Sequence, residues 1–267
     1  MNFISRRKFI QRALVTSSMV SMSGYSMSRD QSLEKWELGM QGAKTMNCTL
    51  AEEISILGRL GYKWLELRDW KLEAFLRDQS MEELRERFEK FQVKPISISA
   101  IELHSLGSGP DRDGMKERHE WYFQMARDTG CQSVLVVHFG QVSENMSALE
   151  IRRRAVDDLK YMSDLAAKYE VTATYEFLGA QKLPVHTVAE TMEILNGADR
   201  ENLRWVFDFY QFHAGDRSLE ALAKSDIRTL NIVHICDAKD LPYDQLEPPN
   251  SQRLFPGDGV CASREIL

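Results

Sequence analysis

Short hydrophobic runs alternate along the chain with longer segments in which apolar residues recur every three or four positions. Runs of the first kind are typical of β-strands, and segments of the second kind are typical of amphipathic helices. The pattern predicts strands over residues 36–40, 63–68, 95–101, 133–139, 171–177, 203–209 and 229–235. It predicts helices over residues 50–62, 80–91, 115–130, 148–169, 186–198 and 218–225.

This alternation of strands and helices predicts an α/β fold built on a parallel sheet. The run Ser133–Phe139 is almost wholly apolar, as expected of a strand that is covered on both faces. Right-handed crossovers would roll such strands into a (β/α)8 TIM barrel. After the seventh strand come a proline-rich loop and, from Cys261, the opening of a helix, so the pattern supplies no eighth strand.

One barrel domain is expected over residues 36–267, because no Gly/Pro/Ser-rich linker or block of charge divides that region. The first 28 residues have a different character. Ser5-Arg6-Arg7-Lys8-Phe9-Ile10 is a twin-arginine pattern followed by an uncharged stretch rich in Ser and Met. We therefore expect residues 1–28 to be an export signal, residues 29–35 to be a linker, and the protein to be periplasmic. The uncharged stretch is too short and polar to act as a stable membrane anchor.

Charge and cysteine spacing narrow the possible partners. The 267-residue chain has a net charge of −6, and removal of residues 1–28 would take away four basic side chains and change it to −10. A nucleic acid partner would require the opposite sign. The four cysteines show no C-x-x-C spacing, which argues against a zinc ribbon or a thioredoxin-like motif. A small carbohydrate is the expected partner, and a homo-oligomer is possible.

Three residues with metal-binding side chains close consecutive predicted strands. Glu176, Asp208 and His234 are separated by 32 and 26 residues, about one strand-helix unit each. In a parallel barrel this spacing places all three at the carboxyl ends of neighbouring strands, where such enzymes build their active sites. Oxygen and imidazole donors suit Mn²⁺, Mg²⁺, Co²⁺ or Zn²⁺, and the absence of a thiolate favours a hard ion, with Mn²⁺ first. A carboxylate beside such an ion can remove a proton next to a carbonyl, and Glu176 is the candidate base.

The sequence resembles the xylose-isomerase-like TIM barrels of sugar-phosphate isomerases and epimerases, a family that includes ketose 3-epimerases, hydroxypyruvate isomerases and inosose dehydratases. The resemblance runs from Leu38 to the last residue. It is carried by YEF at Glu176, VFDFYQFHAGD at Asp208, VHICDAKD at His234 and R-x-x-PGDG from Arg253. It implies that the three strand-end residues are metal ligands and that Glu176 also transfers the proton.

Two departures from the family pattern stand out. Family members commonly carry a histidine three residues after the aspartate, whereas this chain has Gln211 there and its nearest histidine is His213. Strand alternation would place Gln211 and His213 on the same face. The family also has a final strand with a second catalytic glutamate that is the fourth metal ligand. Either the chain is a fragment or frameshifted product, or a partner supplies that strand. We favour the first explanation, and it predicts marginal stability.

Further residues are candidates for binding substrate at the same end of the barrel. Glu66, His104 and His138 are expected to end the second, third and fourth strands, and His213 and Arg253 lie in family motifs. Helix capping and loop hydrogen bonds are the competing explanations for Glu66, His104 and His138, and exposure to solvent is the competing explanation for Arg253.

The leading functional hypothesis is a metal-dependent isomerase or epimerase that abstracts a proton beside the carbonyl of a sugar or keto-sugar. One alternative is a lyase or dehydratase acting on a keto-sugar or inosose, because the same proton abstraction can expel a β-leaving group. Another is a non-catalytic carbohydrate-binding barrel. The repair endonucleases of the same superfamily are disfavoured by the acidic charge, the export signal and the three-residue ligand set.

Overall fold

The computed structural model describes residues 37–106, 113–140, 146–246 and 252–261, together with the single residues 142 and 266. Residues Glu37–Cys261 form one compact unit. The predicted signal, 1–28, and linker, 29–35, lie outside the described residues, as does most of the segment after Cys261. Among the described helices, none combines the length and the apolar character needed to cross a membrane.

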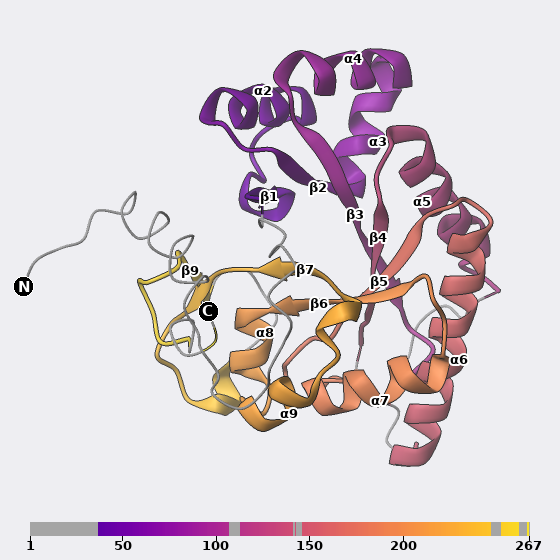
Figure 1. Ribbon diagram of the computed structural model, residues 1–267, viewed down its shortest axis with the longest axis vertical. Helices are drawn as coiled ribbons and strands as arrows, with labels where there is room; N and C mark the ends of the chain where they lie inside the picture. The colour runs from indigo at the N-terminus through magenta and orange to yellow at the C-terminus, as the bar shows by residue number, and fades with distance from the viewer. Residues whose placement is uncertain are drawn as a thin grey trace, which may run out of the picture. The chain divides into compact units, whose positions relative to one another are not determined.

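The centre of this unit is a parallel sheet of seven strands that follow one another in sequence order (Figure 1). This confirms the predicted number, order and direction of the strands. In the described part of the chain, no backbone pairing joins β7 to β1. The strands are β1 (Gly39–Gln41), β2 (Trp64–Arg68), β3 (Lys94–Leu103), β4 (Ser133–His138), β5 (Thr172–Glu176), β6 (Leu203–Asp208) and β7 (Leu230–His234).

All six predicted helices are present, and two further helices, α3 and α8, directly follow strands. Short 3-10 turns follow β1 and precede β7. The helices are α2 (Leu50–Leu60), α3 (Asp69–Asp78), α4 (Met81–Phe91), α5 (Lys116–Thr129), α6 (Ala148–Ala167), α7 (Val188–Ala198), α8 (Phe209–Ala214) and α9 (Leu219–Lys224), with 3-10 turns η1 (Gly42–Lys44), η2 (Ile227–Thr229) and η3 (Tyr243–Gln245).

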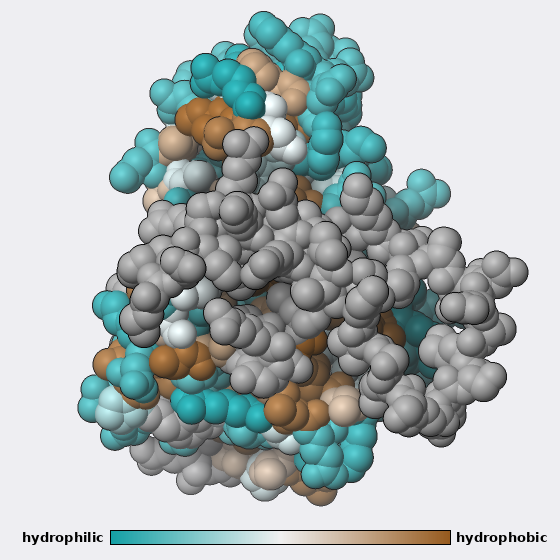
Figure 2. All heavy atoms as spheres, turned by 60° about the vertical axis from the view of Figure 1, so that its left-hand side comes forward, coloured by the Kyte–Doolittle hydropathy of each residue, from teal (hydrophilic) through white to brown (hydrophobic). Residues whose placement is uncertain are grey.

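Local sequence sets the helix ends. Thr49, Ser80 and Thr187 each begin a helix with a capping box, in which the hydroxyl accepts from the third residue and that residue's glutamate accepts from the cap backbone. Gly61 and Gly130 end α2 and α5 with positive φ angles of 82° and 78°, a conformation that glycine adopts without strain. In the upper part of Figure 2, where α2 and α4 lie, hydrophilic side chains predominate, as expected of helices with only one buried stripe.

The two unpredicted helices begin without a connecting loop. The first, α3, follows β2 directly, and its highly charged sequence buries only Lys71, Leu72 and Phe75, so its periodicity is weak. The second, α8, begins after Asp208, whose carboxylate accepts from the backbone N–H of Gln211 at 3.0 Å and caps the helix. The prediction that strand alternation continues through Gln211 and His213 is therefore wrong, because the chain turns into a helix at Phe209.

The inner face of the sheet carries an apolar layer below a polar one. Leu135 and Val137 of β4, Val206 of β6 and Ile232 of β7 belong to one buried cluster. Successive strand side chains point to opposite faces, so residues two positions beyond Val206 and Ile232 also point inward. Those residues are Asp208 and His234, and the apolar layer thus forms the floor beneath them.

A small antiparallel hairpin follows the sheet, formed by β8 (Asp237–Ala238) and β9 (Arg253–Leu254). The Asp237 carboxylate, almost fully buried, accepts backbone N–H groups of Ala238, Gly257 and Cys261 at 3.0, 3.0 and 2.7 Å. This one side chain therefore fastens the loop after β9. The consequence for the site is that Arg253 is held in place against β6.

Candidate metal centre

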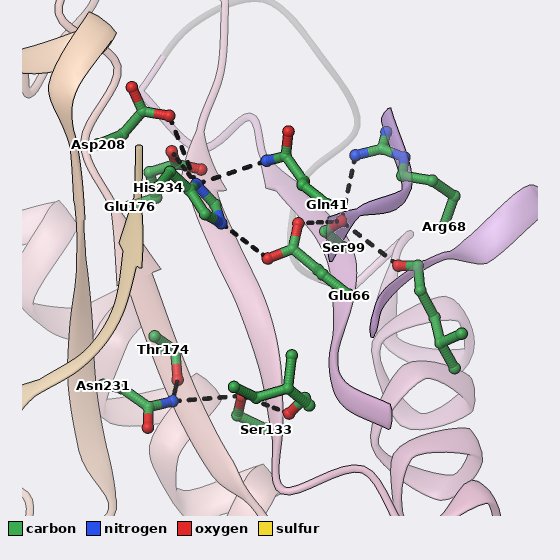
Figure 3. Close-up of polar contacts among 12 residues, drawn as sticks. Gln41, Glu66, Arg68, Ser99, Ser133, Thr174, Glu176, Asp208, Asn231 and His234 are labelled. Atoms are coloured by element: carbon green, nitrogen blue, oxygen red, sulfur yellow. Dashed lines mark hydrogen bonds and ion pairs between the residues drawn. The ribbon is translucent and has the colours of Figure 1, made fainter. Parts of the chain in front are cut away.

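Glu176, Asp208 and His234 converge at the carboxyl ends of β5, β6 and β7 (Figure 3). Each offers one donor atom, and these atoms all lie within 4.8 Å of one another. The Nδ1 atom of His234 lies 3.2 Å from Glu176 Oε1 and 3.4 Å from Asp208 Oδ2. Because metal bonds to nitrogen and oxygen are about 2.0–2.2 Å long, atoms this close can share one ion. The trio therefore has the donor set and the spacing of a divalent-metal site.

Strand register brings the three side chains together. Glu176 pairs with Val206, and Asp208 pairs with His234, so the three strands end at nearly the same level. The carboxylates of Glu176 and Asp208 are buried, and the ring of His234 is 10 % exposed. The cluster is therefore shielded from water on most sides, which strengthens every electrostatic interaction within it.

The two carboxylate oxygens of Asp208 have different roles. Its Oδ1 caps α8, and its Oδ2 belongs to the metal cluster. Arg253 Nη1 contacts both carboxylate oxygens, at 2.9 and 2.7 Å. Burial alone would raise the pKa of Asp208, but Arg253 and His234 outweigh burial and hold that pKa far below its usual range. Asp208 is therefore ionised at neutral pH.

Arg253 reaches the cluster from β9 with a side chain that is only 8 % exposed. Its guanidinium carbon lies 4.6 Å from the centre of the Tyr210 ring, and its Nη1 lies 3.1 Å from the sulfur of Cys236. Its Nε is buried and has no hydrogen-bond partner among the described residues. The predicted candidate is thus at the site, where ion pairing and stacking hold it.

Glu66 also belongs to this cluster. Its Oε2 lies 2.9 Å from His234 Nε2, and its Oε1 accepts from the hydroxyl of Ser99 at 2.9 Å. The predicted strand 63–68 does end at Arg68, so Glu66 lies inside β2 and the expectation that it ends the second strand is wrong. Burial alone would raise the pKa of Glu66, but the charge of His234 and the hydrogen bonds it receives lower it.

The electrostatics of His234 and Glu176 follow from their shared burial. Burial opposes a charged imidazole, but the carboxylates of Glu66 and Glu176 outweigh it and raise the pKa of His234 far above its usual value. Burial raises the pKa of Glu176, although His234 partly offsets this effect. Glu66, Glu176 and Asp208 thus lie around His234. Arg253 contacts Asp208, and the nearby ammonium of Lys44 also interacts electrostatically with Asp208 and Glu176.

His138 is not at the mouth of the barrel, so its predicted role in binding substrate there is wrong. Since Leu135 and Val137 point inward, the next side chain, His138, points outward toward the helices. Its Nδ1 lies 3.1 Å from the hydroxyl of Tyr175, and its Nε2 lies 3.3 Å from Asp158 Oδ2. It is 1 % exposed and serves as a hydrogen-bonded core residue.

The other two predicted histidines lie outside the metal cluster. His104 follows β3 in a loop, where its Nε2 lies 3.7 Å from Glu102 and its ring meets Phe139 edge-on. His213 is buried within α8, and burial lowers its pKa. Neither has a described contact with the three candidate ligands.

The sequence analysis missed several side chains at the site, among them Lys44, which interacts electrostatically with Asp208 and Glu176. Gln41, the last residue of β1, has its amide nitrogen 3.4 Å from His234 Nδ1. Ser99 holds Glu66, and Arg68 Nη1 donates to the same hydroxyl at 3.2 Å. The strand-end position that singled out the trio also marks Gln41 once β1 is correctly bounded. Nothing in the local sequence marks Ser99, which lies inside β3.

Comparison with known protein families shows to which family this fold belongs. Residues 54–267 match the model of the xylose isomerase-like TIM barrel. The chain belongs to the xylose isomerase-like TIM barrel family. Its curated relatives include inosose isomerase of Bacillus velezensis, 28 % identical over 218 residues that cover 80 % of this chain and 76 % of the relative. Inosose isomerase of Halalkalibacterium halodurans is 28 % identical over 231 residues, covering 85 % and 80 %.

Solved structures of the family agree on the fold. The IOLI protein, crystallised with a bound zinc atom, superimposes with a TM-score of 0.79 at 27 % identity, covering 86 % of this chain and 82 % of its own. A D-psicose 3-epimerase studied in the presence of D-fructose has a TM-score of 0.61 at 15 % identity, covering 74 % and 72 %, and supports the fold alone.

Proposed function

We propose that this protein is a divalent-metal-dependent isomerase or epimerase of a keto-sugar or cyclic polyol ketone. The observation that carries the proposal is the convergence of Glu176, Asp208 and His234 within 4.8 Å on an apolar floor. The family and the inosose isomerase relatives support the choice of reaction and of a cyclic, unphosphorylated substrate.

Glu176, Asp208 and His234 would hold the ion. When bound there, a divalent cation polarises a carbonyl and acidifies the neighbouring C–H group. Glu176 is the group that takes the proton beside the carbonyl and, in an isomerisation, returns it to the neighbouring carbon; burial raises its pKa, and a carboxylate of raised pKa holds a proton better near neutral pH. Epimerisation would need a second proton donor on the opposite face of the substrate.

Mn²⁺ is the proposed ion, because two carboxylates and one imidazole suit a hard cation; Mg²⁺, Co²⁺ and Zn²⁺ remain in the set to be tested. The zinc in the IOLI crystal supports keeping Zn²⁺ in that set. Elemental analysis of the purified protein, followed by titration of metal-stripped protein with each ion, identifies the one that binds most tightly.

The decisive experiment incubates metal-loaded protein with inososes and unphosphorylated ketoses in deuterated water. Isomerisation or epimerisation incorporates deuterium beside the carbonyl and keeps the elemental composition, whereas a dehydratase product lacks one water. Glu176→Gln should abolish exchange and keep only part of the metal-dependent stabilisation, because the amide oxygen of Gln is a weaker ligand than a carboxylate. Metal-loaded wild-type protein that incorporates no deuterium from any substrate of the panel would refute an enzymatic role and favour a binding protein.

We also propose export by the twin-arginine route and function in the periplasm, supported by Arg6-Arg7 and the uncharged stretch after them. Replacement of both arginines by lysine should retain the protein in the cytoplasm. Equal recovery of the two forms from the periplasm would contradict this proposal.

A further inference from the structure

The second nitrogen of the candidate metal-binding histidine has a dedicated carboxylate partner. His234 Nε2 lies 2.9 Å from Glu66 Oε2, while its Nδ1 faces Glu176 and Asp208 (Figure 3). The two ring nitrogens therefore point to different groups. A histidine that binds a metal through one nitrogen usually donates its other N–H to a carboxylate or carbonyl, which fixes the tautomer and the ring orientation.

From this geometry we propose that Glu66 is a positioning residue for the metal centre. It holds His234 with the proton on Nε2, so that the Nδ1 lone pair points at the space shared with Glu176 and Asp208. This inference rests on the proposed metal site. It replaces the prediction that Glu66 binds substrate.

Glu66 is itself held rigidly. It is 3 % exposed, and its backbone lies in β2 between Gln41 of β1 and Ser97 of β3. The remaining oxygen accepts from Ser99, whose hydroxyl in turn receives a hydrogen bond from Arg68. Both oxygens of Glu66 are thus engaged by protein groups, and little of the side chain is open to a ligand.

The contact also matters because of where it occurs in the sheet. Glu66 is on β2 and His234 is on β7, which have no backbone pairing with each other in the described residues. The orientation of the ring is therefore not fixed by strand pairing alone. A carboxylate reaching across the mouth supplies that restraint.

The test measures metal binding, with no substrate present. Metal-stripped wild-type protein, Glu66→Gln and Glu66→Ala are titrated with Co²⁺, and affinity is followed by calorimetry and by the visible absorption of the bound ion. Loss of an outer partner of this kind weakens metal affinity by about 10–100-fold. We expect Glu66→Ala to lie near the upper end of that range and Glu66→Gln, which keeps an acceptor oxygen, near the lower end. The absorption band should shift in Glu66→Ala, because the ring is free to turn.

Glu102→Gln is the matched control, since it removes a carboxylate that is 53 % exposed on the neighbouring strand β3. It should bind Co²⁺ as the wild type does. If Glu66→Ala does not fold, the Co²⁺ affinity of Glu66→Gln alone tests the positioning role, because Gln has nearly the same shape as Glu.

Metal affinity within twofold of wild type and an unchanged band in both folded variants would overturn the positioning role. A raised KM for sugar with unaltered Co²⁺ binding would assign Glu66 to the substrate. Wild-type protein that binds no Co²⁺ would overturn this inference together with the proposed function, whereas failure confined to the Glu66 variants leaves the proposed function standing.

Discussion

Replacing Lys71 with Met tests how the turn beside the metal centre is held. The ammonium of Lys71 lies 3.1 Å from Glu53 Oε1, and both side chains are at most 1 % exposed. It also donates to the carbonyls of Gly42 and Thr45 at 3.3 and 2.7 Å and contacts the Thr45 hydroxyl at 3.2 Å. These contacts fasten η1 to α3, and η1 directly follows Gln41 at the site.

The expected magnitude follows from what each variant leaves behind. Lys71→Met leaves Glu53 buried with only the Thr45 hydroxyl as a partner, and breaking a buried ion pair in this way costs about 3–5 kcal/mol. For a chain of this size, about 2–4 °C of Tm is lost per kcal/mol, so Tm should fall by roughly 6–20 °C. Glu53→Gln should cost less, because Lys71 keeps three oxygen acceptors.

Urea unfolding followed by circular dichroism measures both variants, the double variant and Lys63→Met, a control at an exposed lysine. Burial raises the pKa of Glu53, and the contacts of Glu53 with Thr45 and Lys71 offset part of that rise. A carboxyl group with a raised folded pKa favours the folded state at low pH, so the deficit of Lys71→Met should shrink as the pH falls toward 4.5. A loss below about 1 kcal/mol, or an equal loss in Glu53→Gln, would refute the reasoning.

The remaining predictions concern the site and its supports. His234→Ala should keep its fold but lose the rise in Tm that bound metal gives the wild type; a retained rise would contradict the ligand assignment. Burial opposes a charged His234, but Glu66 and Glu176 outweigh burial and raise the pKa of His234. In the metal-free protein, the charged imidazole therefore stabilises the fold fully below about pH 6.5, the pKa of an unfolded histidine. This stabilisation is lost as the pH rises through the higher pKa of the folded state. Unfolding at several pH values shows this, and a contribution that grows with pH would contradict it. Asp237→Ala leaves three backbone N–H groups without their acceptor, so protease should cut the loop 252–261 faster than in the wild type; an equal cutting rate would contradict the anchoring role of Asp237. His138→Ala should lower the free energy of unfolding by about 1–3 kcal/mol without altering metal binding, because it removes the contacts with Tyr175 and Asp158. Weaker metal binding in this variant would contradict the assignment of His138 to the core.

The sequence alone determined the elements of the sheet and the candidate ligands. The short hydrophobic runs of strands and the periodic apolar positions of helices are local patterns that can be read from the sequence. Parallel strands place their carboxyl ends at the same edge of the sheet. Glu176, Asp208 and His234 could be recognised because each closes a β-type run and the three are separated by about one strand-helix unit each. Helix caps such as Thr49 and Ser80 were also visible, since a capping box lies within four consecutive residues.

Tertiary structure decided which way side chains point and what they contact. One residue of difference in a strand reverses the face, which turned His138 away from the mouth toward Asp158. The pairing of Glu66 with His234 joins residues 168 positions apart, and that of Arg253 with Asp208 joins residues 45 apart. No local pattern encodes such contacts, because they depend on the register of several strands and on the loops that bring distant carboxylates and cations together.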